Sequence, residues 1–244
     1  MDSSTHGPTC RPPDCPHVTQ SVTDERRSEL EPREEILDAA ACLFVERGFA
    51  ATPPRKIAEA AGIREPLIRH HFPAGKDEIL AELLQRSIRP RLDNLEKIED
   101  LRAATGAGPE ALLYTLAVLD ARTLARAPHN LGALARQPEA YRQDVGAHFR
   151  AAQDELLATY IRLADQVSDI VPSTVVAAPS GYFLGTMLLQ QVDGVVEMRS
   201  EGSQITPEIE ASVAATCLRV CLSDPTRVNE IAAKAAGLIR MLDA

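Results

Sequence analysis

Apolar residues recur three or four positions apart through most of the chain, a spacing that places them on one face of an α-helix. No stretch alternates between apolar and polar positions as a half-buried strand does. Proline marks the first helical positions of several segments. Long helices are predicted near 76–102, 110–127, 138–168, 178–198, 207–223 and 226–242, with a short turn around 130–135. The pattern predicts an all-α protein.

Three shorter helices are predicted before residue 76. The first begins at Pro32, a residue that suits a first helical position, and stops at Gly48. The second covers 53–61, with Thr52 as its N-cap. The third covers 65–71 and ends before a proline. Their order and closeness are typical of a helix-turn-helix.

The helix-turn-helix depends on Gly62, which allows a sharp turn between the second and third helices. We expect the packing residues of this unit to be Ile57, Ala58, Ala61, Ile63, Ile68 and Phe72. The outward face of the third helix then carries Glu65, Pro66, Leu67, Arg69 and His70. A helix that lies in the major groove reads base edges from such a face, and basic groups beside it contact phosphates.

Charge is distributed unevenly along the chain. The formal net charge is −9, which argues against unspecific coating of nucleic acid. Between Thr52 and Lys76, however, five Lys or Arg residues face two acids, a local excess of three positive charges. A small basic patch on an acidic protein suits binding at specific DNA sites.

The chain divides into three predicted parts. Residues 1–32 are proline-rich and poor in apolar side chains, so we expect a disordered arm. Residues 33–80 form the helix-turn-helix domain, and 81–244 form a helical body. The arm holds His6, Cys10, Cys15 and His17, whose spacing matches no zinc pattern, so no metal is expected. The five cysteines suit no disulfide framework, and we interpret Cys42, Cys217 and Cys221 as packing residues.

The segment 33–80 resembles the N-terminal domain of the TetR family. It reads REEILDAAACLFVERGFAATPPRKIAEAAGIREPLIRHHFPAGKDEIL. The matching elements are Ile36-Leu37, Ala39-Ala40, Leu43-Phe44, Arg47-Gly48, Ala51-Thr52, Ile57-Ala58, Ala60-Ala61-Gly62, His71-Phe72, and Lys76 with Leu80. The resemblance implies a one-component transcriptional regulator, by default a repressor, that binds double-stranded operator DNA.

The resemblance also implies roles for single residues. Thr52 and Arg55 would cap the second helix and touch phosphate, and His71 and Lys76 would contact phosphates as well. Three residues depart from the family pattern. Arg64 stands where a Ser or Thr usually caps the third helix, Arg69 replaces a common aromatic residue, and Pro66 lies in the first turn. These departures bear on base specificity and leave the fold intact.

In this family the helical body binds a small-molecule effector and forms a homodimer. The resemblance places the dimer contact on the helices near 178–198 and 207–223. Candidate ligand-binding residues combine apolar groups with a few polar ones. They are Tyr114, Arg122, Tyr141, His148, Phe149, Phe183, Met187 and Gln190. The sequence does not identify the effector.

Other classes of function have little support. We find no catalytic triad order, phosphate loop or helical metal motif, so neither an enzyme nor a cofactor is expected. No apolar run approaches the length of a membrane span and no secretory signal is seen, which predicts a cytoplasmic protein. Two alternatives stay open: a DNA-binding regulator without ligand sensing, and a helical carrier or enzyme with an incidental helix-turn-helix.

Overall fold

The computed structural model describes residues 24–168 and 180–243, and all regular elements in these ranges are helical. The elements are α1 (Asp24–Arg47), α2 (Pro54–Ala60), α3 (Glu65–His71), α4 (Lys76–Thr105), α5 (Pro109–Arg126), the 3₁₀ segments η1 (Pro128–Arg136) and η2 (Pro138–Tyr141), α6 (Gln143–Val167), α7 (Gly181–Ser200), α8 (Pro207–Cys221) and α9 (Arg227–Leu242). The predicted all-α class is therefore confirmed.

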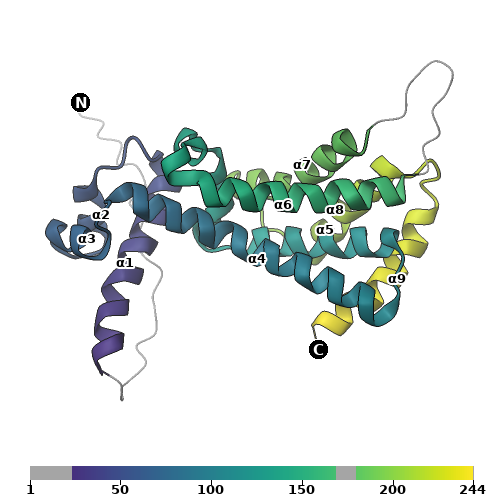
Figure 1. The fold of residues 1–244 in the computed structure, drawn as a ribbon, viewed down its shortest axis with the longest axis horizontal. Helices are drawn as coiled ribbons and strands as arrows, with labels where there is room; N and C mark the ends of the chain where they lie inside the picture. Colours follow the sequence, from purple (N-terminus) through teal and green to yellow (C-terminus); the bar gives the residue numbers. More distant parts are fainter. Residues whose placement is uncertain (1–23, 169–179, 244) are drawn as a thin grey trace, which may run out of the picture.

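The molecule is elongated, with α1, α2 and α3 at one end and the remaining helices at the other (Figure 1). Helix α4 begins beside α3 and runs into the body, so one continuous helix joins the two ends. Helix α5 lies at the centre of the body, and residues on all of its sides are buried. This arrangement makes α4 and its neighbours the route between the helix-turn-helix and the body.

Helix α1 starts eight residues earlier than the sequence predicts. It begins at Asp24, and Pro32 lies inside it instead of at its first position. Residues 24–31 include Glu, Arg and Leu, which favour helix strongly enough to offset the hydrogen bond that proline cannot donate. The predicted arm is thus helical over 24–32, and its residues 1–23, with the two histidines and two cysteines considered for metal, lie outside the described residues.

The predicted helix at 138–168 is also divided in two. Arg142 has ψ 140°, an extended conformation that ends η2 and precedes α6. Directly after this break, a Cβ atom on Gly146 would lie 1.7 Å from the carbonyl oxygen of Ala140. The close approach of η2 to the first turn of α6 therefore requires glycine, and a continuous helix cannot make it.

Two polar side chains connect the body to the end of α1. Gln137, between η1 and η2, accepts a hydrogen bond from Phe49 N at 3.3 Å and donates one to Phe44 O at 3.5 Å. His129 Nε2 lies 3.6 Å from the Asp38 carboxylate on α1. The helix-turn-helix thus contacts η1 of the body as well as α4.

Candidate nucleic-acid interface

The turn between α2 and α3 has the geometry that the sequence predicts. Gly62 has φ +68°, a left-handed conformation that favours glycine, and it separates α2 from α3 by a sharp turn. Ile57 and Ala58 are buried on α2, and Ile68 and Phe72 are buried on or after α3. Apolar residues therefore hold α3 against α2 and fix which face of α3 points outward.

The outward face of α3 is open to solvent. Glu65, Pro66, Arg69 and His70 are exposed, and Leu67 is half-buried. Arg64 precedes the helix as its N-cap residue and makes no capping hydrogen bond with its side chain, as the sequence indicates. His71 is half-buried, with its ring 5.1 Å from that of His70 in an edge-on arrangement. These side chains form a mixed cationic and apolar face of about two helical turns.

Helix α2 adds a second cationic group beside this face. Arg55 is 78% exposed and pairs with Glu59 one turn along α2 at 2.9 Å, and Lys56 pairs with the same carboxylate at 2.8 Å. Hydrogen bonds from Lys56 and Arg55 lower the pKa of Glu59. Exposed i,i+4 pairs are weak, so a phosphate competes readily for Arg55.

The structure corrects the role predicted for Thr52. The N-cap of α2 is Pro53, and Thr52 is 1% exposed. Its hydroxyl donates to Gly48 O at 2.9 Å and approaches Leu43 O at 3.4 Å. One acceptor lies in the last turns of α1 and the other directly follows the helix, so the hydroxyl ties Thr52 back to the end of α1. Its side chain therefore stabilises the turn after α1, and as a buried donor it is closed off from phosphate.

Lys76 makes contacts within the protein. Its Nζ atom donates to Phe49 O at 2.9 Å and Thr52 O at 3.2 Å, and it lies 4.1 Å from the centroid of the Phe49 ring. The ammonium group thus holds the start of α4 against the turn between α1 and α2. These contacts give Lys76 a part in positioning the helix-turn-helix, and its phosphate contact stays a prediction.

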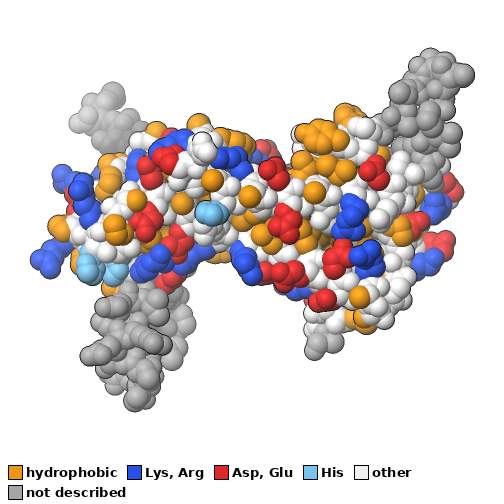
Figure 2. Space-filling view, in the orientation of Figure 1, with side chains coloured by type: hydrophobic (Ala, Val, Ile, Leu, Met, Phe, Trp, Pro, Cys, Tyr) orange, Lys and Arg blue, Asp and Glu red, His pale blue; other side chains and the backbone are white. Residues whose placement is uncertain are grey.

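Positive side chains gather at the α2–α3 end of the molecule, whereas the body shows both signs interspersed (Figure 2). This agrees with the local positive excess between residues 52 and 76 on a chain of net charge −9. A field of one sign confined to one end orients an approaching polyanion toward that end. The surface therefore has one face suited to DNA.

The comparisons with known proteins concern both ends of the molecule. A family model described as bacterial regulatory proteins, tetR family, matches residues 36–83. The crystal structure of AmtR from Mycobacterium smegmatis superposes with a TM-score of 0.66 and 30% sequence identity, covering 84% of this chain and 94% of that one.

The chain belongs to the TetR family.

Among curated sequences, this TetR-family chain is similar to the HTH-type transcriptional repressor KstR2 of Rhodococcus jostii (strain RHA1), with 41% identity over 98 residues. The match covers 40% of this chain and 48% of that protein, so the chain spans about half the length of this curated relative. The structure of AibR in complex with isovaleryl coenzyme A and operator DNA has a TM-score of 0.60 at 16% identity, covering 74% of this chain and 94% of that one. At this identity the likeness to AibR concerns the fold alone.

The eight candidate ligand-binding residues do not meet in one cavity. Tyr114 and Phe149 are buried, and the Tyr114 hydroxyl donates to Ala211 O at 3.4 Å. Tyr141 and Phe183 lie on the surface, with exposed fractions of 63% and 55%. Of the other four, three are an exposed histidine on α6 and two side chains of α7, one half-buried and one exposed: His148, Met187 and Gln190.

Arg122, another candidate ligand-binding residue, is engaged in ion pairs within the protein. Its Nε donates to Glu210 at 3.0 Å, and its Nη1 pairs with Asp243 at 3.2 Å. Glu210 is 5% exposed, so Arg122 is the partner that makes burial of this carboxylate tolerable. The guanidinium joins α5 to α8 and to the end of α9.

A buried polar network at the centre of the body escaped sequence reasoning. Asp120 on α5 accepts hydrogen bonds from Asn94 at 3.0 Å and Tyr160 at 3.0 Å, and Arg91 approaches it at 3.4 Å. Arg91 also donates to Asp193 on α7 at 2.9 Å. Burial raises the pKa of Asp120, and its three donors oppose that shift by stabilising the carboxylate. We call Arg91, Asn94, Asp120, Tyr160 and Asp193 the core network.

A groove of about 760 Å³ lies where α1, α4 and α6 meet. His148 and Ala152 of α6 form one wall, and Glu82 and Arg86 of α4 lie on the other side. Among the candidate ligand-binding residues, His148 lines this groove. The groove is at the joint between the helix-turn-helix and the body.

The two helices predicted to dimerise are only partly apolar on their outer faces. Leu184, Leu188, Val195, Val196, Ala214, Cys217 and Cys221 are buried inside the chain. Phe183, Met187, Gln191, Ile209, Val213 and Val220 remain exposed or half-buried. Hydrophobic side chains also gather over the start of α7 (Figure 2). Burial raises the pKa of Cys217 to about 12, so it is a neutral packing residue, as predicted. No helix in the described ranges is long and apolar enough to cross a bilayer.

Proposed function

We propose that the chain is a transcriptional repressor that reads a palindromic operator with α3 and is released by a small-molecule effector. The observation that carries the proposal is the exposed face of α3, with Arg64, Arg69 and His70 directed outward beside Arg55 of α2. Repression is supported by the 41% identity with KstR2, a named repressor. Such a protein acts in the cytoplasm, where the operator is.

Each dimer would place two copies of α3 in successive major grooves about 34–36 Å apart. Glu65, Pro66, Leu67, Arg69 and His70 would face base edges, while Arg55, Arg64 and His71 would contact phosphates. Arg69 is the residue best suited to a guanine, because its planar fork pairs with O6 and N7 together.

Replacing Arg69 by alanine is expected to relax base preference at one position of each half-site. Loss of a bidentate pair to guanine costs about 1–3 kcal/mol of discrimination, roughly 5- to 150-fold. Selection of duplexes from a random library by the wild type and by Arg69→Ala would measure this, with Lys56→Ala as a control for charge. Identical base preferences for wild type and Arg69→Ala would show that Arg69 does not contribute to base recognition.

We propose that the exposed apolar residues of α7 and α8 form the dimer contact. An apolar face of this kind on two adjacent helices pairs with its own copy about a twofold axis. Phe183 and Tyr182 of α7 are the large hydrophobic side chains most exposed on these two helices, at 55% and 65%.

The double substitution Phe183→Glu/Val213→Glu is expected to give a monomer, because it places carboxylates of both copies in a desolvated contact. Light scattering coupled to size exclusion reports the mass directly. Met241→Glu changes another exposed large hydrophobic residue, on α9, and serves as the matched control. A dimer in the double variant, or a monomer in the control, would contradict the assignment.

One observation favours a second candidate, a repressor without an effector. The centre of the body, between α4, α5, α6 and α7, is occupied by the core network, and the candidate ligand residues are dispersed. Binding of a ligand there requires the network to open.

The two candidates differ in how ligands change operator affinity. A panel of acyl-CoA thioesters, starting with isovaleryl-CoA because AibR binds it, would be titrated against the protein and against its operator complex. An effector lowers operator affinity only to the extent that it binds the DNA-free conformation more tightly than the DNA-bound conformation. A ligand that binds and leaves operator affinity unchanged would favour the second candidate.

A further inference from the structure

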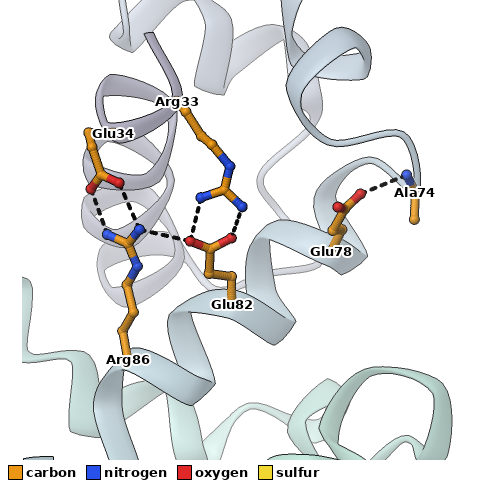
Figure 3. A network of polar contacts seen from close by, with 6 residues as sticks. All are labelled: Arg33, Glu34, Ala74, Glu78, Glu82 and Arg86. Carbon is orange, nitrogen blue, oxygen red and sulfur yellow. Dashed lines mark hydrogen bonds and ion pairs between the residues drawn. The ribbon is translucent and has the colours of Figure 1, made fainter. Parts of the chain in front are cut away.

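A stripe of charged residues on α4 connects it to α1 and to the turn after α3. Glu78, Glu82 and Arg86 are four residues apart and share one face of α4 (Figure 3). Glu78 accepts a hydrogen bond from Ala74 N at 2.9 Å, just after α3. Glu82 and Arg86 engage two adjacent residues of α1. The first three turns of α4 therefore contact both α1 and the turn that follows α3.

In one of the two ion pairs between α1 and α4 the arginine lies on α1, and in the other it lies on α4. Arg33 donates two hydrogen bonds to Glu82, one of them at 2.6 Å. Glu34 accepts two from Arg86 at 2.6 and 2.8 Å, and Arg86 also donates to Glu82 at 2.7 Å. The same Arg33 guanidinium lies 4.8 Å from the centroid of the Phe72 ring, at the end of α3. We call Arg33, Glu34, Glu82 and Arg86 the α4 clasp (Figure 3).

This alternation of charge specifies one register between the helices. Moving α1 one turn toward the start of α4 would bring Glu34 against Glu82. Moving it one turn the other way would bring Arg33 against Arg86. Like charges in contact are penalised, and bidentate arginine–carboxylate pairs fix rotation as well as distance. Side-chain exposures of 20–48% leave each pair weak in stability terms. Their main effect is geometric.

We propose that the α4 clasp positions the helix-turn-helix on the body and thereby sets the spacing between the two operator half-sites that the dimer accepts. The inference rests on the proposed operator binding. Because α1 carries α2 and α3, a change of register on α4 moves the recognition helix relative to the dimer contact. The groove beside the clasp leaves room for this movement, since α6 does not fill the space next to Glu82 and Arg86.

The test compares operator duplexes whose half-sites are separated by one base pair more or fewer than the preferred spacing. Arg86→Glu breaks both of its pairs and faces Glu34 and Glu82 with a like charge. We expect the affinity ratio between the preferred and altered spacings to fall about tenfold, or about 1.4 kcal/mol. The quadruple exchange Arg33→Glu/Glu34→Arg/Glu82→Arg/Arg86→Glu restores every ion pair with inverted polarity and should restore the ratio.

Arg89→Glu is the matched control, because it makes the same charge change on α4 and loses only an exposed pair with Asp93. Its ratio should equal that of the wild type. A loss of net charge or of stability lowers affinity for both spacings equally and leaves their ratio unchanged. A purely structural role of the α4 clasp would therefore not change the ratio. Arg86→Met, without the added negative charge, replaces Arg86→Glu if that variant does not fold.

An unchanged ratio in the folded Arg86 variant, or no recovery in the quadruple exchange, would overturn the role of the clasp and leave operator binding intact. Absence of DNA binding by the wild type would overturn the proposed function, and the clasp inference with it.

Discussion

Replacing Asp120 by alanine is expected to lower the free energy of unfolding by about 3–5 kcal/mol, the usual cost of removing one partner from a buried ion pair. Asp120 is 0% exposed and accepts from Asn94 and Tyr160 beside Arg91. In the variant these donors stay buried without their acceptor. Urea unfolding at one fixed protein concentration measures the change, since the stability of a dimer depends on concentration.

Asp193→Ala provides the control at the other side of Arg91. The Asp193 side chain is 40% exposed, so solvent replaces it, and a loss of about 1 kcal/mol or less is expected. The large difference between the two variants is the specific prediction. Equal losses, or a loss under about 1 kcal/mol for Asp120→Ala, would mean that the core network does not hold α4, α5 and α6 together.

Removing Arg55, Arg64 and Arg69 together is expected to abolish tight operator binding. Arg55→Ala/Arg64→Ala/Arg69→Ala takes six positive charges from the dimer, and each phosphate contact contributes about 0.9 to the salt slope. The slope of log affinity against log salt should become shallower by up to about five. Affinity at physiological salt should fall roughly 10³-fold, because fewer counterions are released when these phosphate contacts are lost. Fluorescence anisotropy over a range of salt concentrations measures both.

The matched control is Lys97→Ala/Arg102→Ala/Lys234→Ala, which removes the same number of exposed positive charges from the far end of the body. Its net charge is equal to that of the first variant, so any difference in slope comes from position. If the two triple variants bind DNA alike, the α2–α3 face is not the DNA-binding surface.

Local structure near the helix-turn-helix could be predicted from the sequence because single residues determine it. Gly62 adopts the left-handed conformation that the turn needs, and α3 has the predicted bounds 65–71. Proline at the first positions correctly indicated the starts of α5 and α8. The expected outward direction of Arg69 and His70 follows from burial of Ile68 and Phe72 on the opposite side.

The sequence could not show which polar side chains find partners far along the chain. Arg91 and Asp120 are 29 residues apart, and the pairing of Arg122 with Asp243 spans 121. Neither has a local signal. Thr52 was misjudged for a related reason, because its hydroxyl bonds back to Leu43 O and Gly48 O and does not cap α2. The burial of the candidate ligand-binding residues likewise depends on how the helices pack together, which the sequence does not show.

The most direct test of operator binding is selection of fragments from the source genome by the purified wild-type protein, with sequencing of what is retained. The account predicts enrichment of a few sites that share a palindrome, and loss of that enrichment with Arg55→Ala/Arg64→Ala/Arg69→Ala. Absence of any enriched site with folded, dimeric protein would contradict the claim that α3 reads DNA sequence.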